Sequence, residues 1–261
     1  MSTPLHVEEY GEPGSPVVVF LHGLLGSSRN WRSVARDLAG EYRIFALDLP
    51  EHGSSPHSPA TDLKQMIQQI NQWLDHHIGE SYVLCGHSLG GKVAMGLACA
   101  RPQPIKGLVV VDIAPRDYPP GHHLPTLEAL LNLDLSALQS RKQADEELAS
   151  KIPNWAFRQF LLTNLSQKED GFFWRCNLPV LHAGMVHLSR NPLQSGDRFD
   201  GPTLFLRGGK SGYLRSEHIP LVREAFAQSQ VVTLPEAGHD LHVEDKKGFL
   251  SHFRTFLLSV A

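Results

Sequence analysis

Four short apolar runs lie in the first 115 residues. Apolar residues follow one another in each run, whereas a half-buried strand would alternate apolar and polar residues. They occupy residues 16–23, 41–50, 82–86 and 106–115 and are rich in valine, isoleucine and leucine. Continuous β-branched runs of this length are typical of strands that are buried on both faces of a sheet. The pattern therefore predicts four strands of a parallel sheet.

Between these runs, apolar residues recur at intervals of three and four, which predicts helices. One helix is expected over residues 27–40, and another follows Ser88. The clearest spans residues 61–79, with Thr61 or Asp62 as its cap. Its apolar stripe consists of Leu63, Met66, Ile67, Ile70, Trp73, Leu74 and Ile78. This alternation predicts an α/β fold, a mostly parallel central sheet with helices on both faces.

The alternation stops after residue 115 and resumes at about residue 201. The intervening segments with a helical pattern are residues 126–133, 140–152, 154–165 and 178–188, and residues 171–177 between them could be extended. We therefore expect a core domain in two parts, residues 1–115 and 201–261, interrupted by a helical cap at residues 116–200. The cap leaves the sheet after Asp112, at the carboxyl ends of the strands, where open α/β sheets bind ligands.

Completion of the core is expected after the cap. The predicted elements are strands at residues 202–208 and 230–240, and helices at residues 216–228 and 243–260.

A serine follows the third apolar run in the pattern Gly86-His87-Ser88-Leu89-Gly90. A strand before and a helix after this G-x-S-x-G pattern give the context of a strained turn that exposes the serine hydroxyl as a nucleophile. Small flanking residues let such a turn close tightly. The alternative is a serine that only caps the helix. The context favours the nucleophile.

A nucleophilic serine needs a histidine base on a loop near the sheet edge. His239 follows the last predicted strand directly after a small-residue pair, so its loop can reach back toward Ser88. His242 lies nearer the closing helix, and we expect it to be a residue of the first helical turn or a surface group. We expect His87, beside the serine, to pack locally.

The histidine in turn needs an orienting acid. The loop at residues 206–218, where many enzymes of this architecture carry that acid, has Lys210 and Ser211 and no carboxylate before Glu217. Asp112 ends the strand after the nucleophile helix, and neighbouring strands are only about 4.8 Å apart. We therefore assign the acid to Asp112, with a capping or turn aspartate before Pro115 as the alternative.

Two backbone amides are expected to bind the developing oxyanion. The Leu89 amide lies at a helix N-terminus, where the helix dipole favours negative charge. The loop after the first central strand, residues 21–28, supplies the second amide at Leu24. A backbone donor places little demand on the side chain, so leucine is acceptable at both positions.

Composition narrows the function further. The chain has 261 residues, is 41% hydrophobic and carries a formal charge of −3, so electrostatics give no reason to expect nucleic acid or an anionic membrane as a partner. The first residues lack a basic region and a long apolar segment, and no run is long enough to span a bilayer. Three cysteines do not form a disulfide framework, and the 15 histidines are scattered without the framing of a metal site. We expect a cytoplasmic protein that needs no metal or cofactor.

Seven blocks, in order along most of the chain, resemble the α/β-hydrolases and more narrowly the small YbfF-type esterases. They are residues 22–31, 48–55, 86–95, 109–115, 171–178, 207–214 and 237–244. The resemblance implies a helical cap, a Ser-Asp-His triad of Ser88, Asp112 and His239, and hydrolysis of acyl esters or thioesters. Pro50-Glu51 departs from related loops in this group, so the resemblance does not predict the pocket wall at this loop. We expect Asp48 to organise that loop.

The expected activity is hydrolysis of esters or thioesters with short to medium acyl chains through an acyl-enzyme. Two alternatives remain: a carbon–carbon bond hydrolase or lyase on the same fold, and a non-catalytic binding protein for small molecules. Lys92 and Arg175 could face an anionic leaving group such as a coenzyme A phosphate, but solvated surface positions are expected for both. Candidate pocket residues in the cap are Trp155, Phe157, Phe160, Phe172, Phe173, Trp174, Leu181 and Met185.

Overall fold

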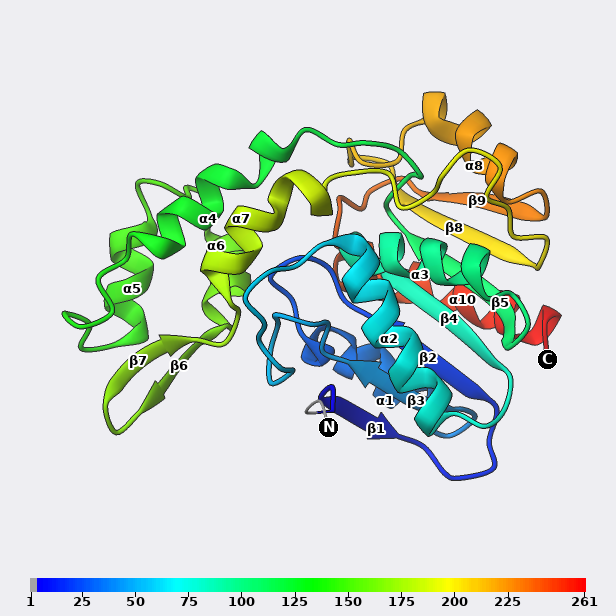
Figure 1. Ribbon diagram of the computed structural model, residues 1–261, viewed down its shortest axis with the longest axis horizontal. Helices are drawn as coiled ribbons and strands as arrows, with labels where there is room; N and C mark the ends of the chain where they lie inside the picture. The colour runs from blue at the N-terminus through cyan, green and yellow to red at the C-terminus, as the bar shows by residue number, and fades with distance from the viewer. Residues whose placement is uncertain (1–3) are drawn as a thin grey trace.

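The apolar runs pair into one seven-stranded sheet in the computed structural model, which describes residues 4–261 (Figure 1). Across the sheet the strands are β1 (Val7–Tyr10), β3 (Arg43–Leu47), β2 (Val17–Leu21), β4 (Tyr82–His87), β5 (Ile105–Val111), β8 (Thr203–Gly208) and β9 (Ser229–Leu234). Every neighbouring pair is parallel except β1 with β3. The predicted mostly parallel sheet is confirmed.

Strand β1 was not expected from the sequence. It has no apolar run, because Glu8 and Glu9 stand in its middle. Pairing with the buried strand β3 forms it, with Val7 opposite Leu47 in the register. Charged residues are tolerated there because β1 is the edge strand of the sheet.

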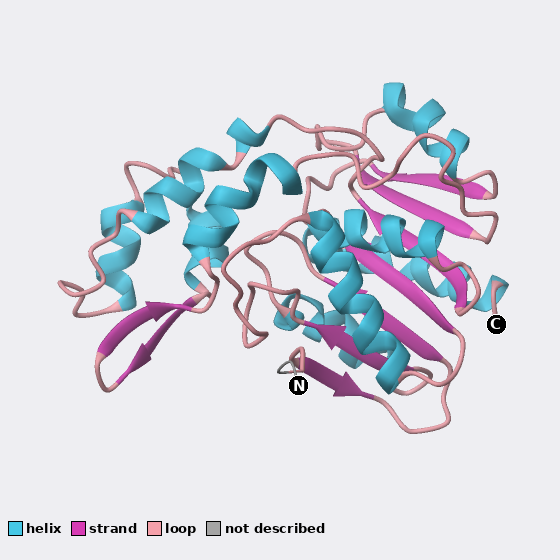
Figure 2. Ribbon diagram, viewed as in Figure 1, coloured by secondary structure: helices cyan, strands magenta, loops and turns pink. Residues whose placement is uncertain are grey.

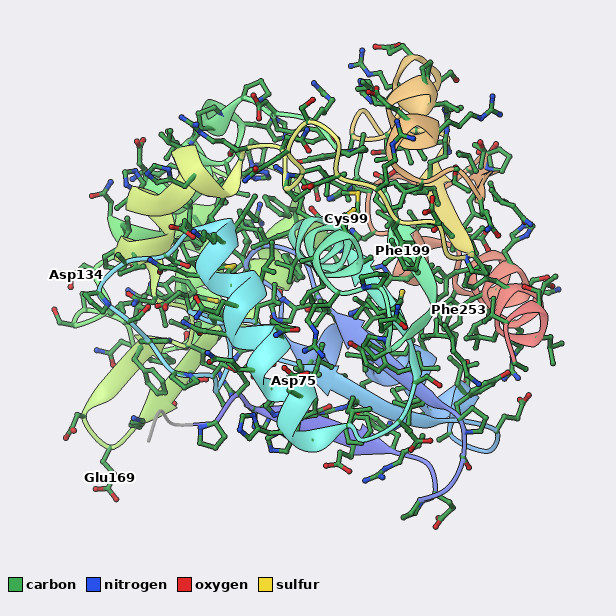
Figure 3. All side chains as sticks on the ribbon, turned by 45° about the vertical axis from the view of Figure 1, so that its right-hand side comes forward. Asp75, Cys99, Asp134, Glu169, Phe199 and Phe253 are labelled. Carbon is green, nitrogen blue, oxygen red and sulfur yellow. The ribbon has the colours of Figure 1, made fainter. Side chains whose placement is uncertain are left out.

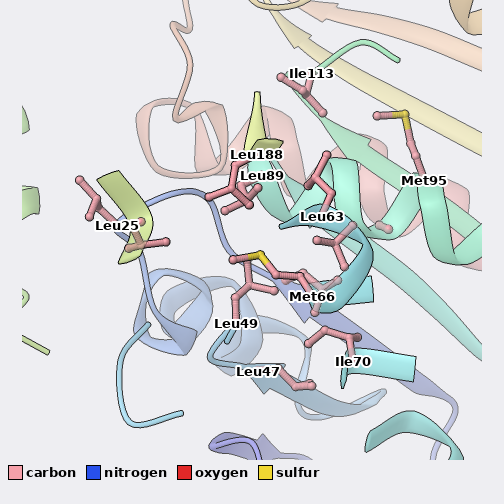
Figure 4. Close-up of a cluster of buried hydrophobic side chains, with 14 of the residues drawn as sticks. Leu25, Leu47, Leu49, Leu63, Met66, Ile70, Leu89, Met95, Ile113 and Leu188 are labelled. Atoms are coloured by element: carbon pink, nitrogen blue, oxygen red, sulfur yellow. The ribbon is translucent and has the colours of Figure 1, made fainter. Parts of the chain in front are cut away.

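Side chains alternate between the two faces of the strands and build two separate apolar layers. On β2, Val17, Val19 and Leu21 point into one layer, and Val18 and Phe20 point into the other. The first layer is covered by α2 (Leu63–His77), α3 (Leu89–Ala100) and α8 (Ile219–Ala225), and Figure 4 shows part of it. The second is covered by α1 (Arg32–Leu38) and α10 (Lys246–Ser259). Helices on both faces are therefore confirmed, and Figure 2 shows them flanking the strands.

Residues 116–200, called the insertion below, lie between β5 and β8 and extend away from one end of the sheet (Figure 1). Its helices are α4 (Leu124–Leu131), α5 (Arg141–Leu148), α6 (Trp155–Leu162) and α7 (Leu178–Leu188). The segment at residues 171–177 is extended in its first part, where β7 (Gly171–Trp174) pairs with β6 (Leu165–Lys168). Figure 3 shows Glu169 at the tip of this hairpin, pointing outward.

The two ends of the insertion are tied to each other where they meet the core. The Tyr118 amide donates to the Ser189 carbonyl at 2.8 Å. The Asn191 amide donates to Asp117 Oδ1 at 2.6 Å. The chain thus leaves and re-enters the core at one place, called the root of the insertion below.

Glu51, in the loop that departs from related sequences, joins the insertion to the core. It is buried and its φ is +69°. Its carboxylate accepts hydrogen bonds from Ser58 and, at 2.7 Å, from the Asn177 side-chain amide. The Glu51 carbonyl also accepts from the Asn177 amide at 2.9 Å. This unusual residue therefore fixes the start of α7.

Across residues 4–261, none of the helices combines the length and the apolar character that crossing a bilayer requires.

Candidate active site

Ser88 occupies a strained turn between β4 and α3. Its φ is +51°, a conformation that costs energy for any residue with a side chain. A Cβ on Gly86 would collide with the Gly90 carbonyl, and a Cβ on Gly90 would collide with the Leu21 carbonyl. Only glycine therefore fits at these two positions, which explains the small residues around the serine.

Asp112 and His239 are brought together from positions 127 residues apart. Asp112 follows β5, is fully buried and has a φ of +51°. The His239 Nδ1–H donates to Asp112 Oδ2 at 2.7 Å. The Gly208 amide donates to Oδ1 at 3.0 Å, and the Ser211 hydroxyl donates to Oδ2. The carboxylate is thus satisfied by groups that also fix its orientation.

Ser88 and His239 line the same large cavity. Within the part of the chain that the structure describes, no hydrogen bond joins the Ser88 hydroxyl to His239. Such bonds are often long in a free enzyme and tighten when substrate binds.

Two residues beside the histidine were missed from the sequence. Ser211 lies in the loop that lacks a carboxylate, and its hydroxyl donates a hydrogen bond to Asp112.

The Tyr213 ring stacks on His239 with centroids 3.9 Å apart. The Tyr118 hydroxyl donates to the Tyr213 carbonyl at 2.7 Å and accepts from the Ala114 amide at 2.9 Å, so this stack is anchored to the root of the insertion. The only sequence signal was two tyrosines near predicted strand ends.

His87 does more than pack locally. Its Nε2 lies 3.0 Å from the His239 carbonyl, and the two rings are 4.6 Å apart. Burial and the neighbouring His239 lower the pKa of His87 to about 4. The ring is therefore neutral near pH 7, and its Nε2–H can donate to that carbonyl and support the loop that carries His239.

His242 lies in the first turn of α9 (Leu241–Glu244), as expected, but it is not a surface group. It is buried and stacks on Trp31 with ring centroids 4.4 Å apart. Burial holds the pKa of His242 well below its ordinary value. This histidine is therefore part of the packing behind the site.

The loop that carries Leu24 is held on both sides. The Leu49 amide donates to His22 Nε2 at 2.9 Å, so His22 carries its proton on Nδ1 and donates it to the Gly23 carbonyl at 2.7 Å. Leu25 has a φ of +58°, and its carbonyl accepts from the Asn164 side-chain amide at 2.6 Å. Asn164 belongs to the insertion and is buried. The insertion thus completes the support of this loop.

Asp48 organises the neighbouring loop, as expected from the sequence. Its buried carboxylate accepts from the Ser28 amide at 2.6 Å and from the Ser54 amide at 2.7 Å. None of the Asp48 hydrogen bonds involves Asp112 or His239.

Two cavities of very different size meet at Ser88. The large cavity, about 850 Å³, is lined among others by Phe157, Phe160, His239, Asp240 and Val243. The small cavity, about 40 Å³, is lined among others by Leu89, Lys92, Ile113, Tyr118, Met185 and Leu188. Leu24, Ser88, His123 and Tyr213 border both. Of the candidate pocket residues in the insertion, Phe157, Phe160 and Met185 line a cavity, and the other candidates line neither of these two.

Lys92 is not a solvated surface residue, and the expectation from the sequence is wrong. It is 3% exposed, and its Nζ donates to the carbonyls of Leu188 at 3.2 Å and Arg190 at 2.7 Å. Burial lowers the pKa of Lys92 to about 7. Arg175 is half-buried, contacts the Ser54 hydroxyl and does not line either cavity at Ser88.

Within residues 4–261, no three His, Cys, Asp or Glu side chains are grouped so that they could hold a metal ion.

Comparison with known proteins gives concordant results. The family model for the α/β hydrolase fold matches residues 16–246. The sn-1-specific diacylglycerol lipase ABHD11 of Mus musculus is 38% identical over 254 residues, covering 95% of this chain and 82% of that protein. Esterase YbfF of Escherichia coli is 32% identical, covering 93% of both. A marine microorganism esterase of known structure superimposes with a TM-score of 0.93 at 33% identity, covering 98% of this chain and all of the other.

Proposed function

Since this chain belongs to the α/β-hydrolase family, we propose that it is a serine hydrolase of carboxylic esters, with Ser88 as nucleophile, His239 as base and Asp112 as the orienting acid. The contact between His239 Nδ1 and Asp112 Oδ2, beside a cavity that Ser88 shares, is the observation that carries the assignment. The esterases and the lipase among its relatives support the same chemistry.

In the first half-reaction, His239 Nε2 takes the Ser88 proton as Oγ attacks the ester carbonyl carbon. The carbonyl oxygen becomes an oxyanion bound by the Leu24 and Leu89 amides. The Leu89 amide is suited to this role because, as the first of helix α3, it has no acceptor within its own helix. The carbon–oxygen bond then breaks, and the alcohol leaves with the proton that His239 returns to it.

In the second half-reaction, His239 removes a proton from water, and the hydroxide attacks the acyl-Ser88 carbonyl. The new oxyanion uses the same two amides. Its collapse releases the acid, and Oγ recovers the proton from His239. Thioesters follow the same course with a thiol as leaving group, so they belong to the proposed substrate class.

Asp112 has two roles in this scheme. Its bond to His239 Nδ1–H keeps Nε2 unprotonated and facing the serine, and its charge stabilises the imidazolium that forms. Donors from Gly208 and Ser211 hold the carboxylate in place during both steps.

We also propose that the insertion at residues 116–200 acts as a cap on a core formed by residues 1–115 and 201–261. Phe157 and Phe160 from α6, and Met185 and Leu188 from α7, line the two cavities at Ser88. A cytoplasmic location belongs to the same proposal, because the three cysteines are free thiols, which reducing compartments maintain.

Hydrolysis of p-nitrophenyl acetate by the wild-type protein and by Ser88→Ala tests the proposal. Turnover that disappears in Ser88→Ala, with an unchanged circular dichroism spectrum, supports it. Equal turnover in both proteins would remove Ser88 as nucleophile. Ligand binding without turnover of any ester would favour the non-catalytic alternative.

A further inference from the structure

We propose that the two cavities at Ser88 divide the substrate at its ester bond, so that the small cavity holds the acyl group and the large cavity holds the alcohol or thiol. The preferred substrates are then esters of short acids with large leaving groups. This inference rests on the proposed function and specifies its substrate class.

The position of the catalytic histidine gives the direction of the leaving group. In the tetrahedral intermediate the leaving oxygen must accept a proton from His239 Nε2, so it lies within hydrogen-bond reach of that ring. His239 lines the large cavity and is not among the residues that line the small one. The alcohol therefore departs into the large cavity.

The remaining substituents of the carbonyl carbon follow from this placement. One is Ser88 Oγ, and another is the oxyanion between the Leu24 and Leu89 amides. The acyl carbon takes the fourth direction, away from His239. The small cavity is the second space that Ser88 borders, and its lining includes Leu89 and Leu188 but not His239, so we place the acyl carbon there.

The volume of the small cavity limits the acyl group. A water-sized group needs roughly 10–15 Å³ of cavity space, so about 40 Å³ holds about three such groups. Acetyl to butanoyl groups fit this space. The large cavity, at about 850 Å³, is within the range of about 300–1,000 Å³ that accommodates drug-sized ligands.

The wall of the small cavity is held rigidly. Lys92 fastens the end of α7 to the nucleophile helix through the carbonyls of Leu188 and Arg190. Its Nζ also lies 4.9 Å from the centroid of the Tyr118 ring. These three contacts occupy the terminal nitrogen, so the lysine presents its apolar stem to the small cavity. The large cavity, by contrast, has an exposed side chain at its rim: Val243 is 63% exposed, whereas Lys92 in the small cavity is 3% exposed.

Two ester series test the division. The first keeps p-nitrophenol and lengthens the acid from acetate through butanoate and hexanoate to octanoate. The second keeps acetate and enlarges the alcohol from ethyl through benzyl to naphthylmethyl. We expect kcat/KM to fall about tenfold or more beyond butanoate, since one methylene too many for a hydrophobic pocket typically costs about 10–200-fold, and to stay level or rise with alcohol size.

Variants in the two cavities separate the two preferences. Leu188→Ala and, independently, Met185→Ala should move the acid optimum to hexanoate or octanoate while the alcohol preference stays as in wild type. Phe157→Ala, the matched control in the large cavity, should change the alcohol preference and leave the ranking of acids unchanged. Thermal melts identify a variant that fails to fold, and the second small-cavity variant then carries the test.

A wild-type preference for octanoate over butanoate, or a change of alcohol preference alone in Leu188→Ala and Met185→Ala, would overturn the division while Ser88-dependent turnover still upheld the hydrolase. Loss of all ester turnover in the wild-type protein would instead remove the proposed function itself, and the division with it.

Discussion

The core and the insertion contribute to the site by different physical means. Ser88, Asp112 and His239 all follow strands of the core, and the first two are held by strained backbone. The insertion contributes apolar side chains and a few polar ones, such as His123, to the cavities, and a side-chain amide, from Asn164, to the Leu24 loop. Changes in the core should therefore alter the rate of the chemical step, and most changes in the insertion should alter which substrates are accepted.

The largest expected effect is in the core. Asp112→Asn keeps an acceptor for the Gly208 amide but turns His239 into the wrong tautomer, which lowers kcat by about 10⁴ in comparable triads. Steady-state kinetics together with a melting curve measure it. A kcat within tenfold of wild type, in a protein that melts normally, would show that Asp112 is not the orienting acid. It would also contradict the expectation that changes in the core control the rate of the chemical step.

Asn164 tests whether a residue of the insertion can also affect the chemical step. Asn164→Leu removes the donor to the Leu25 carbonyl, so the Leu24 amide is no longer fixed beneath the oxyanion. Loss of an oxyanion donor costs about 10²–10³ in kcat, and we expect a loss up to the lower end of that range with KM little changed. Asn177→Ala, which cuts a different link between insertion and core, is the matched control and should leave kcat near wild type. Equal losses in both variants would indicate a general structural effect.

Acid should destabilise the core through its buried histidines. Burial lowers the pKa of His52 to about 3 and the pKa of His87 to about 4, whereas an unfolded histidine titrates near 6.5. Between pH 4 and 6.5 the unfolded chain binds more protons, so the free energy of unfolding rises with pH and falls as the pH is lowered from 7 to 5. Each of the two histidines contributes about 1–2 kcal/mol to that fall.

Urea unfolding at pH 7 and pH 5 measures this dependence. His52→Asn should reduce this pH dependence by the contribution of one histidine, and His76→Asn, a change at an exposed position on α2, should leave it as in wild type. A stability that is the same at both pH values would contradict the burial of neutral histidines in the core.

The smallest effect on stability is expected at the hydrogen bond between Asn177 of the insertion and Glu51 of the core. Asn177→Ala leaves the buried Glu51 carboxylate with one donor fewer, at a cost of about 1–3 kcal/mol. A lower melting temperature with unchanged kcat would agree with this role. An unchanged melting temperature would show that Ser58 alone satisfies Glu51.

Much of the site could be predicted because Ser88 and Asp112 directly follow buried strands, the strongest pattern in the chain, and His239 lies on the loop after the last strand. Ser211 and Tyr213 could not be, because their roles depend on how the loop after β8 folds over Asp112. Strand β1 was missed since only its pairing with β3 defines it. The burial of Lys92 could have been predicted from the sequence, because helix α3 has no polar face on which a lysine could be exposed. The boundaries of the cap remain predictions.

The root of the insertion has a mechanical consequence. Tyr118 and Ser189, which pair there, also line the small cavity, and Lys92 ties the same place to α3. In Figure 1, α6 and the hairpin lie farther out. Any rigid swing of the insertion about its root moves atoms in proportion to their distance from that pivot. The small cavity lies at that pivot and would keep its size in such a swing, whereas the large cavity, lined by α6, would change shape.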